Sequence, residues 1–111
     1  MAAAITTEHY VRRFHTINGS AAKLEAVYEV TLDSSYLLGG EDMDFTDSGV
    51  FTTIDFVKVE TASFDGYIPQ YDLATASIVM FEAGTASAPI DEVDSAEDLS
   101  AVIILCTVVG E

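Results

Sequence analysis

Strict alternation of side-chain character over residues 23–32 is the feature that most constrains the fold of this chain. Successive side chains of a β-strand point to opposite sides, so every second residue falls on the same face. One face is apolar and consists of Leu24, Ala26, Tyr28, Val30 and Leu32. The other face carries Lys23, Glu25, Val27, Glu29 and Thr31. This pattern predicts a half-buried strand of an antiparallel sheet.

Further segments rich in β-branched and aromatic residues extend this prediction along the chain. The expected strands cover residues 9–17, 50–61, 67–71, 77–81 and 101–109. Asn18-Gly19 predicts a hairpin turn after the first of them, because both residues tolerate positive φ. Pro69 has no N–H to donate, which favours a sheet edge for residues 67–71. Residues 50–61 are predicted as a core strand, and residues 101–109, apolar on both faces apart from Thr107, as the centre of a sheet.

The predicted fold is therefore all-β, a small antiparallel sandwich or barrel-like domain with long acidic loops. The chain has 111 residues, the length of a single domain, and half of them are apolar, which is enough to form one core. We expect a single β domain over residues 1–111, with a short flexible N-terminal arm at about residues 1–7. That arm has no basic region and no long apolar stretch, so the sequence predicts no signal peptide.

Two acidic segments are predicted as loops, residues 34–49 and residues 83–97. The first contains Gly39-Gly40, and we expect one helical turn within it. Carboxylates at residues 41–47 and 91–94 are oxygen ligands of the kind that calcium prefers, but the central glycine and closing glutamate of an EF-hand are absent. Ordinary solvated loops fit this composition better. We therefore predict no metal site and no cofactor.

Charge is distributed unevenly along the chain, which has 4 basic and 19 acidic side chains and a net charge of -15. Residues 1–23 hold three of the bases and one acid, whereas the remainder holds one base and eighteen acids. The overall sign repels phosphate backbones and anionic lipid, so nucleic acid and membrane surfaces are poor partners. The weakly basic end suits docking to a partner, while the acidic body stays solvated. Solubility alone, or adaptation to a salty habitat, is the simpler alternative.

Catalytic groups are scarce in this sequence. His9 and His15 are the only histidines, and they lie six positions apart on a predicted strand, about 20 Å from each other and too far to share one metal ion. Cys106 is the only cysteine and lies in the most apolar strand, where a thiol is buried and inert. No glycine-rich phosphate loop or nucleophile elbow is present. The sequence therefore predicts a protein that is not an enzyme.

Aromatic residues are spread evenly, and several fall in predicted loops. Loop aromatics favour contact surfaces. The candidates for an interface loop are Tyr36, Leu37, Leu38, Met43 and Phe45. The alternative is that the aromatic side chains close the open ends of a small sandwich.

Short motifs spread from Val30 to the C-terminus carry a resemblance to a known family. They are Val30-Thr31-Leu32-Asp33-Ser34-Ser35-Tyr36, Gly39-Gly40-Glu41, Thr53-Ile54-Asp55-Phe56-Val57, Gly66-Tyr67 with Tyr71-Asp72, Asp98-Leu99-Ser100-Ala101-Val102 and Gly110-Glu111. In these stretches the chain resembles small structural proteins of tailed bacteriophages, which in turn resemble head decoration or capsid cement proteins. Leu37-Leu38 and the acidic Asp42-Met43-Asp44 depart from the milder loop expected there.

The resemblance implies a structural virion protein that binds the outside of the assembled phage head and stabilises the shell. Its implied partners are the major capsid protein and further copies of the chain, a homotrimer by family analogy. After synthesis in the host cytoplasm, its place would be the outer surface of the capsid. The basic end then supplies the capsid-docking candidates Ile5, His9, Arg12 and Arg13. Because the two arginines are adjacent on a strand, only one of them can reach a given surface.

Two other classes of function remain open. One is a small acidic β module of a phage tail that binds a ligand or a glycan, with calcium assistance as an option. The other is a cytoplasmic β protein that works with an enzyme partner. Copy number in purified virions separates the first of these from a head decoration protein.

Overall fold

The computed structural model describes residues 3–15, 22–62, 66–84 and 90–111. Its elements, apart from one 3-10 helix, are strands: β1 (Ala4–His15), β2 (Ala22–Thr31), β3 (Glu41–Asp42), β4 (Ile54–Thr61), β5 (Tyr67–Asp72), β6 (Ser77–Ala83), β7 (Ile90–Glu92) and β8 (Ile103–Gly110). They form two antiparallel sheets, which confirms the predicted small all-β sandwich. Among the described residues, no helix is long and apolar enough to span a membrane.

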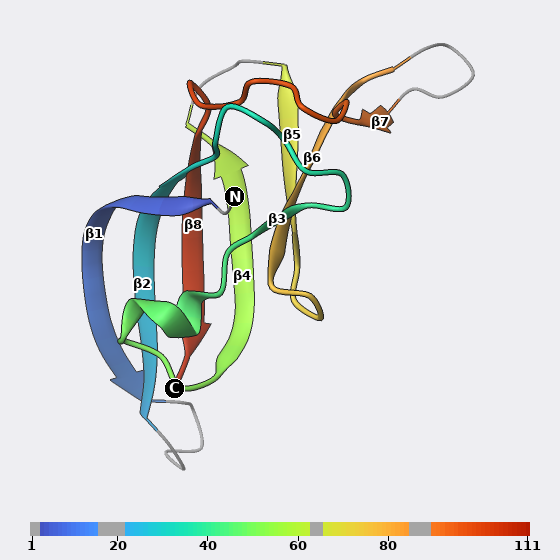
Figure 1. The fold of residues 1–111 in the computed structure, drawn as a ribbon. Helices are drawn as coiled ribbons and strands as arrows, with labels where there is room; N and C mark the ends of the chain where they lie inside the picture. The colour runs from blue at the N-terminus through green and yellow to red at the C-terminus, as the bar shows by residue number, and fades with distance from the viewer. Residues whose placement is uncertain (1–2, 16–21, 63–65, 85–89) are drawn as a thin grey trace.

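The first sheet has the strand order β1-β2-β8-β4. In Figure 1 its long strands stand side by side, and the β5–β6 pair follows beyond β4. The alternation in β2 has the predicted outcome: Ala26, Tyr28 and Val30 are buried, while the residues between them are half-buried. β8 lies between β2 and β4, so its central position is also confirmed.

The second sheet has the order β3-β6-β5, and β7 also pairs with β6. Pro69 lies in β5, an edge strand, as its missing N–H predicts. On β6, Ile78 and Met80 point into the core, and Val79 and Phe81 are half-buried on the opposite face. One face of this sheet is therefore packed, and the other is partly open.

The core lies between the inner faces of the two sheets and is closed by loop residues. The sheets contribute Ala26, Tyr28, Val30, Ile78, Met80, Ile104, Cys106 and Val108, and the loops contribute Leu32, Tyr36, Met43, Phe51, Val93, Leu99 and Val102. Phe45 opens the 3-10 helix (Phe45–Ser48), the helical turn expected in residues 34–49. Its ring stacks on Tyr28 at 5.6 Å and meets Tyr71 at 5.7 Å. The Asp44 side chain caps this turn by accepting from the Thr46 N–H.

Several expectations differ from the structure. β4 is an edge strand of the first sheet and not a core strand, and Phe56 on it is 53% exposed. The outer face of β8 is only partly covered, because Ile103 is exposed and Leu105 is half-buried, although Val109 on the same side is buried. Within the acidic segment 83–97, Val93 is fully buried. The sequence could not predict these differences because they depend on which elements cover each face.

Strand β1 begins within residues 1–7, the segment predicted as an N-terminal arm. Pairing with β2 begins at Ala4, and the Ala3 N–H donates to the Asp42 carbonyl at 3.2 Å. These backbone contacts join residues 3–7, which the sequence predicts as part of the arm, to β2 and to Asp42. The turn predicted at Asn18-Gly19 lies outside the described residues.

Candidate functional site

The described residues contain no group of three or more histidine, cysteine, aspartate or glutamate side chains arranged to hold a metal ion. Cys106 is completely buried, and burial raises the pKa of its thiol to about 12. A thiol with that pKa is protonated at neutral pH and is a poor nucleophile.

The capsid-docking candidates all lie on β1. Ile5 is half-buried and packs against the core. His9 Nε2 lies 2.8 Å from Glu29 Oε2, and Arg12 Nε lies 2.9 Å from Glu25 Oε1. Arg13 is exposed, and its register opposite Leu24 places it on the other face of the sheet from Arg12, which is opposite Glu25. A partner that approaches Arg12 or His9 must therefore compete with an internal carboxylate.

The interface-loop candidates divide into two groups. Leu37 and Leu38 are 54% and 55% exposed and remain available to a partner. Tyr36, Met43 and Phe45 are buried at 1%, 8% and 0% exposure and offer almost no surface. These three belong to the core, as in the alternative in which loop aromatics close the ends of the sandwich.

Tyr36 holds its loop to the second sheet through a hydrogen-bonded hydroxyl. It donates to Glu92 Oε1 at 2.8 Å and accepts from the Met80 backbone N–H at 3.0 Å. The Gly39 N–H donates to the same Glu92 oxygen at 2.6 Å. Burial raises the pKa of the Tyr36 phenol, so the hydroxyl keeps its proton. The exposed Leu37-Leu38 pair is thus presented by an anchored loop.

Glu41 is a fully buried acid next to the carboxyl group of Asp33. Burial, followed by the interaction with Asp33, raises the pKa of Glu41 to about 7. The pKa of Asp33 is lowered, first by the Ser35 N–H and then by Glu41. Both carboxyl oxygens of Glu41 are buried without a hydrogen-bond partner, and a protonated Glu41 beside an ionised Asp33 accounts for both directions.

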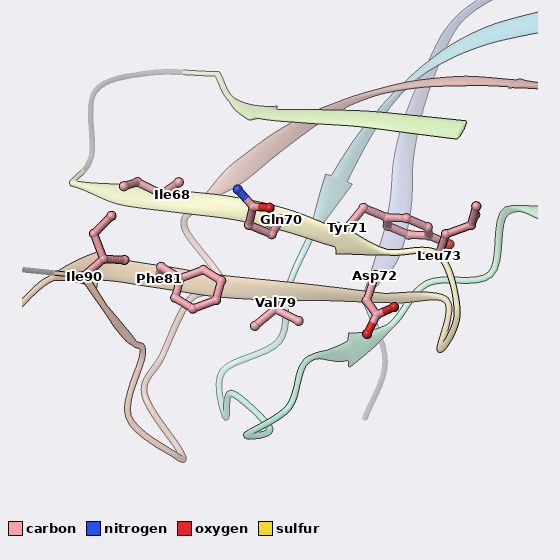
Figure 2. Close-up of a pocket in the computed structure, with 8 residues that line it drawn as sticks. All are labelled: Ile68, Gln70, Tyr71, Asp72, Leu73, Val79, Phe81 and Ile90. Atoms are coloured by element: carbon pink, nitrogen blue, oxygen red, sulfur yellow. The ribbon is translucent and has the colours of Figure 1, made fainter. Parts of the chain in front are cut away.

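A hollow of about 500 Å³ lies on the outer face of the second sheet, and we call it the outer hollow. Its lining residues are Ile68, Gln70, Tyr71, Asp72, Leu73, Val79, Phe81 and Ile90. The sheet register brings Ile68 opposite Phe81, and Gln70 opposite Val79. Figure 2 shows the lining side chains spread along β5 and β6, with Ile90 near one end and Leu73 at the other.

Sequence reasoning missed the outer hollow. Richness in β-branched and aromatic residues did place Ile68, Val79 and Phe81 in predicted strands, and that signal was available. What the pattern lacked was the information that no described element packs over this face. Strand prediction identifies the two faces of a sheet but not which of them stays uncovered.

Comparisons of the chain with protein-family models, curated proteins and solved structures found no match.

Proposed function

We propose that this chain is a non-enzymatic structural protein of a bacteriophage virion that binds the outside of the head and stabilises the shell. The observation that carries the proposal is the outer hollow, an exposed apolar surface on a domain of net charge -15. Apolar side chains gathered on one exposed face are typical of a surface that contacts another protein. The motif resemblance to decoration proteins supplies the class of partner.

The shape of the molecule supports a bridging role. The described residues extend over 48 × 27 × 24 Å, so the domain is elongated. β1, with the basic docking candidates, lies at one end of the strand arrangement, and β5 and β6 lie beyond β4 at the other (Figure 1). Most residues that line the outer hollow belong to β5 and β6. A protein that bridges neighbouring capsid subunits needs two separated contact surfaces. The stabilisation from many weak bridges then adds up over the whole shell.

The net charge supports an external position. Like charges repel, so a chain of net charge -15 is disfavoured next to packaged DNA and tolerated on the solvent side of the shell. We propose the major capsid protein as the partner and further copies of this chain as neighbours. A homotrimer is the oligomer that the resemblance implies, and analytical ultracentrifugation tests it.

Mass spectrometry of purified virions, with absolute copy number, tests the proposal. A head decoration protein is expected at hundreds of copies per particle. Purified chain should also bind heads that were assembled without it, and should raise the temperature at which those heads rupture. Detection of only a few copies, or no binding to bare heads, contradicts the proposal.

A tail module that binds a glycan is the second candidate. Gln70 and Asp72 line the same hollow as the half-buried Phe81, and this favours it, because sugars bind through an aromatic face and polar groups. Such a protein would occur at low copy number and would bind host polysaccharide in place of heads.

A further inference from the structure

The outer hollow contains apolar side chains that a partner can still bury. Ile68, Leu73 and Ile90 are 44%, 49% and 58% exposed, and Val79 and Phe81 lie half-buried between them. Burial of apolar surface contributes about 25 cal/mol per Å². A few such side chains in one hollow are the usual centre of a protein contact.

Charge around the outer hollow selects the kind of partner. Asp72 lines it, whereas Glu82 and Asp91 follow the lining residues Phe81 and Ile90 on β6 and β7 and therefore project to the opposite face. No lysine or arginine follows Lys58 in the sequence. A partner that places cations around an apolar centre therefore complements this surface.

A second copy of the chain is a poor occupant. Two copies would repel each other, because each has a net charge of -15 and carries Asp72 in the hollow. The cations that another copy offers include Arg12, which lies 2.9 Å from Glu25, and Lys23, which lies 2.8 Å from both Asp55 and Glu111. These groups are already neutralised within their own chain.

A sugar is also a weaker fit than a protein side chain. Most of the lining is aliphatic or aromatic, whereas sugar recognition needs several convergent polar groups. The clearly polar lining side chains are Gln70 and Asp72.

We propose that the outer hollow receives an apolar side chain of a capsid subunit, from a segment that carries lysine or arginine beside that side chain. This inference rests on the proposed function, because it names the surface through which the chain would dock. β1 would then be free to contact a second capsid subunit.

Binding of labelled chain to heads assembled without it tests the inference. Ile90→Ser and Leu73→Ser each remove an exposed lining side chain and should lower the affinity about tenfold. Phe56→Ser is the matched control, since Phe56 is 53% exposed on β4 of the other sheet. It should bind within about twofold of the parent. Circular dichroism and thermal unfolding should show all three variants folded.

The cationic part of the inference is tested by Asp72→Asn. This variant should bind more weakly than the parent at low salt and equally at high salt, because screening removes the contribution of Asp72. Equal binding by the parent, Ile90→Ser and Leu73→Ser would overturn the inference while leaving the proposed function intact. Failure of the parent to bind heads would overturn both. Binding of host polysaccharide that Ile90→Ser abolishes would replace the capsid partner with a glycan.

Discussion

Tyr36 and Glu92 join two parts of the chain that are 56 residues apart, through a hydrogen bond of 2.8 Å from the phenol to Oε1. The same hydroxyl accepts from the buried N–H of Met80 at 3.0 Å. One side chain thus completes the hydrogen bonding of a core strand and fixes the loop that presents Leu37 and Leu38. The loop is acidic and glycine-containing, yet it is anchored at its base.

Tyr36→Phe should lower the free energy of unfolding by about 1–3 kcal/mol, because it leaves the Met80 N–H buried without its partner. Urea denaturation measures this change. Tyr10→Phe is the control, since the Tyr10 hydroxyl donates to Glu25 at an exposed site, at 3.0 Å. Its loss should cost well under about 1 kcal/mol. Equal effects in the two variants would contradict the role given to the Tyr36 hydroxyl.

Stability should fall as pH rises from about 4.5 to about 7. Folding raises the pKa of Glu41 from 4.5 to about 7, so the folded chain holds a proton that the unfolded chain has already released. The stabilisation is complete below the lower value and is lost through the upper one, and its size is on the order of 3 kcal/mol. Unfolding measured across this pH range tests it. Glu41→Gln should remove most of the slope, and an unchanged slope would show that Glu41 does not titrate there.

Ile104→Asp should prevent folding. Ile104 is completely buried on β8, and an uncompensated buried carboxylate costs several kcal/mol, comparable with the stability of a small domain. Its neighbour Ile103 is 39% exposed on the outer face of the same strand. Ile103→Asp should therefore remain folded by circular dichroism. A folded Ile104→Asp variant would contradict the assignment of the inner face.

Gly40→Ala should destabilise the fold more than Gly39→Ala. Both glycines have positive φ, 113° and 89°, and each substitution carries the backbone cost of about 1 kcal/mol. A Cβ on Gly40 would also lie 2.9 Å from Val79 Cγ2 and 3.0 Å from the Ile78 carbonyl, whereas Gly39 has open space. Thermal unfolding should place the melting temperature of Gly40→Ala clearly below that of Gly39→Ala. Equal melting temperatures would mean that Ile78 and Val79 of β6 move aside without a loss of stability.

The sequence predicted the parts of the fold that depend on local chemistry. Alternation identified β2 and its buried face, and the missing N–H of Pro69 identified an edge strand. The edge position of β4 was not predictable in the same way, because residues 50–61 are rich in β-formers wherever they lie in a sheet. Neighbours that are distant in sequence decide such placements.

Surface residues were harder to predict than strands. Tyr36 and Phe45 looked like loop aromatics available for contact, but the loop folds back and buries them. Arg12 and His9 were placed on the right strand, whereas their pairing with Glu25 and Glu29 depends on the β1–β2 register. The outer hollow requires both β5–β6 pairing and an uncovered face, and only the first can be predicted from strand patterns.

The central place of β8 in the first sheet also governs the order in which the sheet can form. β2 and β4 both pair with β8, which follows every other described strand in the sequence. During synthesis, the edges of β2 and β4 that pair with β8 therefore stay unpaired until residues 103–110 have emerged. Long-range pairing of this kind is slow, and open strand edges promote aggregation. Fast pairing is thus confined to strands that are neighbours in sequence, β1–β2, β5–β6 and β6–β7, and arrival of β8 sets the time at which the first sheet is complete.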